Sequence, residues 1–278
     1  MKKNVYLAVI TVVTIILIIV GVAWNLSPIA GISLPWKHSE NKEAEKGIKV
    51  TKVWDEQELG DCNTVNIDLS AADLKMEKGD RCEIRFEGNE NLMPEVKAEN
   101  GHWTLTQKQK RIVNFHDLSD NNRIIITVTE GIVPELVKLD VDAGDLNIQG
   151  IQVQAMDIQA DAGDIDLEGV GTQNLKLDLD AGDIDIADTS FTEGKIDADM
   201  GDLSMKNVTF TDLAAEMDAG NVDIHSAVPL DEAEMNLEVD LGDIRVNGQS
   251  SRRSFHQQGS SGVRLSVTAD LGDVKVTW

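Results

Sequence analysis

The chain has 278 residues, 41% of them apolar and 27% charged, which is enough to bury the core of one large domain or two small ones. Asp and Glu number 49 against 25 Lys and Arg, so the net charge is −24. This balance excludes a general nucleic-acid-binding protein, because neutralising phosphates requires clustered basic residues. An aromatic content of 4% also argues against base-stacking platforms.

The N-terminus predicts one transmembrane helix. No charged residue lies between Lys3 and Lys37, and residues 5–24 are dense in Val, Ile, Leu and Ala. Twenty helical residues span about 30 Å, the thickness of the hydrocarbon layer of a bilayer. A cleaved signal peptide is the alternative interpretation, but its apolar segment is shorter, about 7–15 residues, and ends in a small-x-small cleavage site. The length therefore favours an uncleaved anchor.

The flanking charges predict how this anchor lies in the membrane. Lys2 and Lys3 hold the short N-terminus in the cytoplasm. We therefore expect a single-pass plasma-membrane protein, with a cytoplasmic N-terminus and a transmembrane helix in residues 1–24. A polar linker follows in residues 25–47, and the rest of the chain lies outside the cytoplasm. The lipid bilayer is the first predicted partner.

Seven copies of an Asp-x-Gly-Asp/Asn motif dominate the remaining sequence, and the first five follow one another every 19 residues. The copies are LDVDAGDLNI from Leu139, IQADAGDIDL from Ile158, LDLDAGDIDI from Leu177, IDADMGDLSM from Ile196, AEMDAGNVDI from Ala215, LEVDLGDIRV from Leu237 and VTADLGDVKV from Val267. A degenerate copy, IDLSAADLKM, begins at Ile67. A fixed period of this length is typical of a repeat architecture.

Apolar and polar residues alternate on both sides of each motif, as they do in half-buried β-strands. The alternation changes phase at the Gly, which predicts a corner between two strands. Further apolar positions indicate three short strands in each 19-residue unit. One unit could not bury its apolar stripe alone, whereas stacked units could.

Two all-β architectures fit this pattern. In a parallel β-solenoid, equivalent residues stack about 4.8 Å apart, and in an antiparallel array each motif forms a hairpin tip. The residue before the Gly is Met200, Leu241 or Leu271 in three copies, and we expect such large apolar residues at an inward corner. The Asn-Gly and Asp-Gly signals of hairpins do not occur in the seven motifs. We predict a parallel β-solenoid with coils of about 19 residues.

The domain organisation follows from the distribution of the motifs. Residues 48–135 are predicted to form an N-terminal β region and cap that contains the degenerate copy. Residues 136–278 are predicted to form the repeat solenoid. Within it, the segment QSSRRSFHQQGSSG at residues 249–262 is expected to be an exposed loop.

Stacked coils would align the aspartates of the motifs in two files. The first file is Asp142, Asp161, Asp180, Asp199, Asp218 and Asp240, and the second is Asp145, Asp164, Asp183 and Asp202. Carboxylates about 5 Å apart repel by about 1 kcal/mol in water, so some interaction must offset the repulsion. Either each Asp accepts N–H groups of its own corner, or Ca²⁺ binds between carboxylates. The first is favoured, because Ca²⁺ needs about 6–8 oxygen ligands and the Gly-Gly-x-Gly-x-Asp signature of calcium-binding rolls is missing. We predict no metal or cofactor.

The sequence offers no reactive constellation. The five histidines are His38, His102, His116, His225 and His256. None of them has the spacing of a zinc protease, and the chain contains no Cys-x-x-Cys or Gly-x-Ser-x-Gly motif. Arg245 is the only Arg in the motifs before the last loop, which gives little support to a polysaccharide-cleaving β-helix. We predict no catalytic residues.

Two smaller features leave alternatives open. Cys62 and Cys82 flank the degenerate copy, and a disulfide and two buried thiols fit this spacing equally well. Arg252 and Arg253 form the only basic spot in the predicted loop. A solvated loop tip is favoured there over a contact with an anionic polymer or lipid headgroups.

An N-terminal anchor followed by repeated D-A-G-D motifs, as at residues 142–145, 161–164 and 180–183, resembles the bacterial "putative adhesin" domain family. This is a domain-of-unknown-function group of envelope-stress operons, and the resemblance covers roughly residues 48–278. It implies an all-β, solenoid-like, non-enzymatic domain near the cell envelope.

We therefore predict an extracytoplasmic, adhesin-like, scaffold or accessory sensing module, with envelope proteins or cell-wall polymer as partners and no nucleic acid. One alternative is a Ca²⁺-dependent protein that binds or cleaves polysaccharide. The other is an envelope scaffold that polymerises through the solenoid ends.

Overall fold

A computed structural model describes residues 49–107 and 122–278. The predicted membrane helix and linker lie outside these residues, as do His38 and His116. Among the described residues, no helix is long and apolar enough to cross a membrane.

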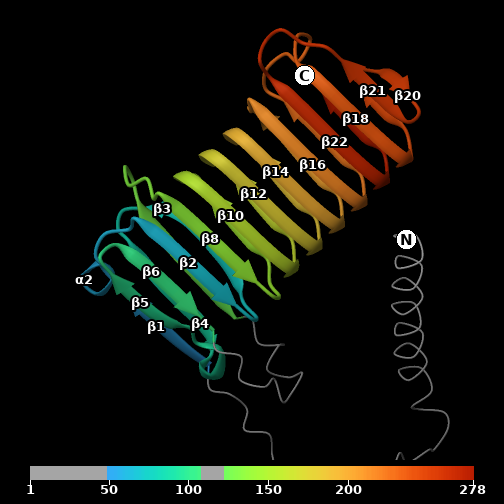
Figure 1. Cartoon of the computed structure of the whole chain (residues 1–278). Helices are drawn as coiled ribbons and strands as arrows, with labels where there is room; N and C mark the ends of the chain where they lie inside the picture. Colours follow the sequence, from blue (N-terminus) through green and yellow to red (C-terminus); the bar gives the residue numbers. More distant parts are fainter. Residues whose placement is uncertain (1–48, 108–121) are drawn as a thin grey trace, which may run out of the picture. The chain divides into compact units, whose positions relative to one another are not determined.

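The described chain folds into two β-sheets with almost no helix (Figure 1). In spatial order, the 12-stranded sheet contains β1 (Lys49–Trp54), β4 (Glu83–Asn89), β7 (Arg123–Thr129), β3 (Asp73–Gly79), β9 (Leu146–Gln149), β11 (Ile165–Glu168), β13 (Ile184–Ala187), β15 (Leu203–Val208), β17 (Val222–Ser226), β23 (Val274–Thr277), β19 (Ile244–Val246) and β20 (Gln249–Ser251). The 11-stranded sheet contains β21 (Ser254–Gln257), β18 (Glu234–Leu241), β22 (Arg264–Leu271), β16 (Asp212–Ala219), β14 (Ser190–Met200), β12 (Gly171–Ala181), β10 (Gln152–Ala162), β8 (Leu136–Val141), β2 (Thr64–Leu69), β6 (His102–Thr106) and β5 (Glu95–Glu99). A short α2 (Glu56–Leu59) and a 3₁₀ turn (Glu90–Leu92) complete the fold.

Each repeat contributes one strand to each sheet, and equivalent residues of neighbouring repeats pair in parallel. Val141, Ala160, Leu179 and Ala198, for example, are successive partners in one column, and all four are buried. Such columns line an apolar interior that runs between the two sheets. The predicted all-β class and the parallel stacking of the repeats are therefore confirmed.

Each coil contains two strands where the sequence predicted three. In β10 the buried residues Val153 and Met156 are three positions apart, so the alternation changes phase inside a continuous strand. Val153 pairs with Thr172 of β12 and Ala155 with Asn174, so the register between the coils is unchanged across this position. The second expected corner is thus a bend within one 11-residue strand.

The spatial order of the coils departs from the chain order at both ends. The coil of β22 and β23, the last in the chain, lies between the coil of β16 and β17 and that of β18 and β19. At the other end, the coil of β2 and β3 lies between β8 and β9 on one side and β6 and β7 on the other. The C-terminal strand β23 is therefore paired along both edges.

The outermost coils are covered by antiparallel strands. Residues 249–262 were expected to form a loop, but they contain β20 and β21, which pair antiparallel with β19 and β18. At the opposite end, β1 and β5 pair antiparallel with β4 and β6. The unpaired N–H and C=O groups of a terminal coil need such partners, which explains why this segment is ordered as strands.

The corner glycines stack so closely that no side chain fits. Gly201 has φ +136°, and a Cβ built on it would lie 1.7 Å from the carbonyl oxygen of Gly182 in the preceding coil. The corner of the degenerate copy carries Ala72 in place of Gly, and Ala72 is not among the residues with positive φ in the described chain. Close backbone approach, together with positive φ, therefore requires glycine at the regular corners.

Gly201→Ala is expected to lower the free energy of unfolding by about 3 kcal/mol or more, because the backbone of two coils must separate. Gly150→Ala is the matched control: Gly150 also has positive φ, +66°, but nothing lies within 4 Å of a Cβ built there. The control should lose only about 1–2 kcal/mol. Urea denaturation of both variants measures the difference, and equal losses would contradict the close stacking.

Candidate functional site: the acidic corner and the pocket at its end

The second aspartate of each motif links one coil to the next. Its Oδ1 accepts a hydrogen bond from the backbone N–H of the equivalent residue in the neighbouring coil. The donor–acceptor distances are 3.2 Å for Asp145 to Asp73, 3.1 Å for Asp164 to Asp145, 2.9 Å for Asp183 to Asp164, 2.8 Å for Asp202 to Asp183, 2.7 Å for Asn221 to Asp202, 3.1 Å for Asp273 to Asn221 and 2.9 Å for Asp243 to Asp273. We call this unbroken series of eight residues the corner ladder.

The corner ladder corrects the expected local turn. The sequence indicated that each Asp would accept an N–H of its own corner, whereas the acceptor and donor lie in different coils. Parallel stacking in register brings each carboxylate beside the N–H of its equivalent, and a charge-assisted bond of this kind is stronger than a neutral one. Asn221 interrupts the row of carboxylates, and its Nδ2 donates to Asp202 Oδ1 at 3.1 Å.

The first file of aspartates lies on the other side of the corner and faces solvent. Burial raises the pKa of Asp199, and the carboxylates of Asp218 and Asp180 in the adjacent coils raise it further. Asp166, on the outer face of the 12-stranded sheet, behaves alike: burial raises its pKa, an effect that a hydrogen bond with Asn147 partly opposes. Ionisation of these carboxyls is therefore less favourable in the folded chain than in the unfolded chain.

A line of apolar side chains separates the two files. Met200 and Leu241, which were expected at an inward corner, point outward and are 57% and 66% exposed. The inside of the corner is occupied by the flanking strand residues, such as Ala198 and Leu203, which are buried. The acidic corner thus consists of two rows of aspartates with a row of Ala, Met and Leu between them.

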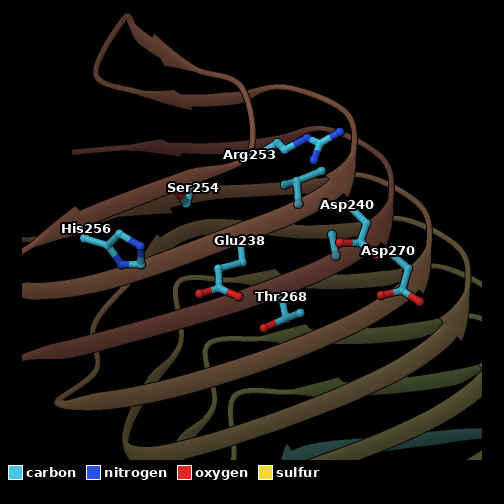
Figure 2. Close-up of a pocket in the computed structure, with 9 residues that line it drawn as sticks. Glu238, Asp240, Arg253, Ser254, His256, Thr268 and Asp270 are labelled. Carbon is cyan, nitrogen blue, oxygen red and sulfur yellow. The ribbon is translucent and has the colours of Figure 1, made fainter.

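A pocket of about 300 Å³ lies on the outer face of the 11-stranded sheet, at its C-terminal end (Figure 2). It is lined by Glu238, Val239, Asp240, Arg253, Ser254, His256, Thr268, Ala269 and Asp270. Figure 2 shows Arg253, Asp240 and Asp270 toward the right of the pocket, His256 at the left, and Glu238 and Thr268 between them.

The pocket forms where β21 joins the sheet against the acidic rows. Glu238 pairs with Thr268 of β22 on one side and with Ser254 of β21 on the other, so these three side chains form one cross-strand row. The backbone N–H of Val239 donates to the carbonyl oxygen of Arg253 at 2.9 Å, which holds the start of β21 in place. The backbone of Arg253 is thereby held next to Val239, at the edge of the pocket.

The charged side chains of the pocket have no partner among the described residues. Glu238, Asp240, Asp270 and Arg253 form no side-chain hydrogen bond or ion pair in this part of the chain. The three carboxylates and the one guanidinium of these side chains sum to a charge of −2. Basic residues on nearby coils are paired instead, as in the 2.8 Å contact between Lys275 and Asp223.

The remaining candidate residues of the sequence are spread over the surface. His102 Nδ1 lies 2.6 Å from Thr64 Oγ1, and His225 Nδ1 lies 3.0 Å from Thr277 Oγ1, each on a neighbouring strand. Arg245 lies 3.8 Å from Asp273. None of these three lines the pocket, whereas Arg253 and His256 do.

Sequence reasoning missed the pocket as a site. The alternation around Phe255, which is partly buried against the core between exposed Ser254 and His256, was its only local signal. Across the described residues, no cluster of His, Cys, Asp or Glu is arranged to hold a metal ion.

Cys62 and Cys82 are buried free thiols, so the structure does not contain the disulfide that was one of the two interpretations. Burial raises the pKa of the Cys62 thiol to about 12, with a further contribution from Cys82. Cys82 Sγ lies 3.3 Å from Thr129 Oγ1. Because the thiolate is the nucleophilic form, Cys62 is an unreactive core residue at neutral pH.

The architecture and the motifs place the chain in a known family. The model of the Toastrack DUF4097 family matches residues 130–277, more than half of the chain, and the protein therefore belongs to this family. No curated protein matches it in sequence.

Several solved structures are similar to the chain. A "putative cell adhesion protein" from Clostridium sporogenes is 15% identical, with a TM-score of 0.35 over 84% of this chain and 99% of that one. A "putative adhesin" from Bacteroides fragilis is 12% identical, with a TM-score of 0.43 over 82% and 97% of the two chains. A "putative lipid binding protein" from Parabacteroides distasonis is 12% identical, with a TM-score of 0.45 over 84% and 98%.

The corner ladder makes a prediction about one of its members. Asp183→Ala removes the acceptor of the Asp202 N–H and should lower the free energy of unfolding by about 0.5–1.5 kcal/mol. Asp183→Asn keeps an acceptor and removes a charge, as Asn221 does naturally, and should cost less than Ala or nothing. Urea titrations at low salt measure both variants. A larger loss for Asn than for Ala would contradict the role assigned to the ladder.

The raised pKa of Asp199 predicts a pH-dependent effect. A carboxyl whose pKa is higher in the folded than in the unfolded chain destabilises the fold when it is ionised. This cost is absent below the unfolded pKa, about 3.9, and is complete once the pH has risen above the folded pKa. Asp199→Asn should therefore raise Tm at pH 7 and change it little near pH 3. Thermal unfolding at both pH values measures this, and an equal gain at both would refute the assignment.

Proposed function

We propose that the protein is a single-pass membrane protein that presents an acidic β-solenoid outside a bacterial plasma membrane, as a non-enzymatic binding module of the cell envelope. Its roles would be adhesion, scaffolding or accessory sensing, with its gene in an envelope-stress operon. The uncharged segment 4–36 after Lys2 and Lys3 supports the anchor, and the polar residues that follow support a tether close to the bilayer.

The acidic corner is the observation that carries this proposal. Its aspartates repeat at the spacing of the coils along one edge of a rigid body, and the ladder bonds hold one row in place. A surface of this kind attracts cationic partners and repels anionic ones over distances up to the Debye length, about 8 Å at physiological salt. Among the predicted partners, it favours basic envelope proteins and amine-bearing cell-wall polymer over anionic headgroups.

Binding to envelope material tests the proposal. A fragment of residues 46–278, whose described parts form one compact unit, would be immobilised and exposed to cell-wall fragments and detergent-solubilised membrane proteins. A triple variant with Asp161, Asp180 and Asp199 changed to Asn keeps the corner ladder and serves as the charge control. We expect wild-type binding that weakens in the variant and at high salt. Absence of binding to both fractions would contradict the proposal.

The membrane anchor has its own test. In the native host, the full-length protein should be found in the membrane fraction, and protease added to protoplasts should cleave its C-terminal domain. Deletion of residues 4–36 should release the protein from the membrane. Protection of the C-terminal domain from the protease would contradict the orientation.

The pocket supports a second candidate, a polysaccharide-binding protein. It brings Arg253, His256 and Asp240 to one concave place. The third alternative, polymerisation through the solenoid ends, is less favoured because β20 and β21, of three and four residues, cover one end and leave little strand edge.

A further inference from the structure

We propose that the pocket lined by Glu238, Asp240, Asp270, Arg253 and His256 binds an amine-bearing saccharide, namely an amino-sugar unit of a glycan. This inference rests on the proposed function and names the ligand class of the binding module. It places glycan recognition in the C-terminal cap, at the end of the acidic corner.

The hydrogen-bonding groups of the pocket match a hydroxyl-rich ligand. Glu238, Asp240 and Asp270 only accept hydrogen bonds when ionised, and Arg253 only donates. Ser254 and Thr268, on either side of Glu238 in the cross-strand row, can do both. A ligand that satisfies this mixture needs donors and acceptors side by side, as neighbouring ring hydroxyls provide. A simple alkyl amine would leave the donors unused.

The negative charge of the pocket indicates that the ligand also carries a positive charge. Asp240 and Asp270 lie on adjacent strands, at the end of the first file, and neither is paired within the described structure. Their carboxylates, with Glu238, outnumber Arg253 and favour a ligand with a positive charge. An ammonium group on the sugar ring would face these carboxylates, and Arg253 would donate to ring or hydroxyl oxygens.

Size and rigidity fit a short stretch of glycan. A volume of about 300 Å³ in an open hollow suits one or two sugar rings better than a folded protein partner. The pairing of β21 with β18 fixes Ser254 and His256, and the bond from Val239 to the Arg253 carbonyl fixes the adjacent residue. The pocket therefore exists before the ligand binds, and little ordering cost is added on binding.

Three β-1,4-linked disaccharides that differ only at C2 of each ring test the ligand class. The glucosamine dimer carries ammonium groups, the N-acetylglucosamine dimer carries neutral amides, and cellobiose carries hydroxyls. Calorimetric titration of the full-length protein in a non-ionic detergent should give about tenfold tighter binding of the glucosamine dimer, since each exposed ion pair contributes a factor of about 2–5. This preference should shrink at high salt. Equal affinities for the three disaccharides would overturn the proposal.

A matched pair of double variants tests whether the saccharide binds in this pocket. Asp240→Asn with Asp270→Asn removes two carboxylates that line the pocket on the adjacent strands β18 and β22, and should weaken binding of the glucosamine dimer about tenfold. Asp178→Asn with Asp197→Asn removes two carboxylates that are register partners on β12 and β14 of the same sheet, outside both aspartate files, and should leave the affinity nearly unchanged. Thermal unfolding of both variants checks that they are folded. Equal losses in both would overturn the assignment to the pocket.

The outcomes also separate this inference from the proposed function. If wild-type protein binds wall fragments or membrane proteins but none of the disaccharides, the pocket inference fails and the binding module stands. If it binds neither envelope fraction, the proposed function fails as well.

Discussion

The contact on which this structure depends is the stacking of one corner directly upon the next. A carboxylate of each coil accepts the backbone N–H of the equivalent residue in its neighbour, and the adjacent glycine leaves no room for a side chain. Because the side chains of a strand alternate with a period of two, a slip by one residue would expose the core and break both corner contacts. The corner contacts and the apolar columns therefore set the register together.

Stacking the corners concentrates negative charge along one edge, and this charge destabilises the folded chain. The pKa of Asp199 is raised by burial and by its neighbours in the file. Asn221 lowers the repulsion between carboxylates within the ladder, because it is neutral. On the sheet faces, ion pairs such as Lys275 with Asp223 and Arg264 with Asp212 lower it as well. The residual charge lies where solvent and partners can reach it. The proposed binding surface is thus a consequence of how the coils are joined.

Much of the fold could be predicted from the sequence, because the period of 19 and the apolar alternation identify the corners, the two aspartate files and columns such as Val141 with Ala160. The order of the last coils could not. The final repeat resembles any other copy in sequence. In the structure, the spacer at residues 227–233 leads from β17 to β18 and leaves one coil position open between them. The last repeat, with β22 and β23, later occupies this position. The outward direction of Met200 and Leu241 was also missed, since alternation does not define side-chain direction at a positive-φ corner.

The pocket could not be predicted from the sequence for a different reason. Arg253 and His256 lie outside the repeats, and they approach Asp240 and Asp270 only because β21 pairs antiparallel with the outermost coil. Long-range pairing of this kind leaves no periodic trace in the sequence. The acidic files were visible as a pattern, but the place where they meet basic and hydroxyl side chains required the three-dimensional arrangement.

Amide hydrogen exchange at the corners tests the central claim most directly. The N–H groups of Asp164, Asp183 and Asp202 lie at the exposed edge of the molecule, where an unbonded amide would exchange rapidly. The ladder predicts protection of these amides approaching that of the buried strands, measured by NMR on the folded protein. Exchange near the rate of an unfolded chain at all three positions would show that the carboxylates do not join the coils.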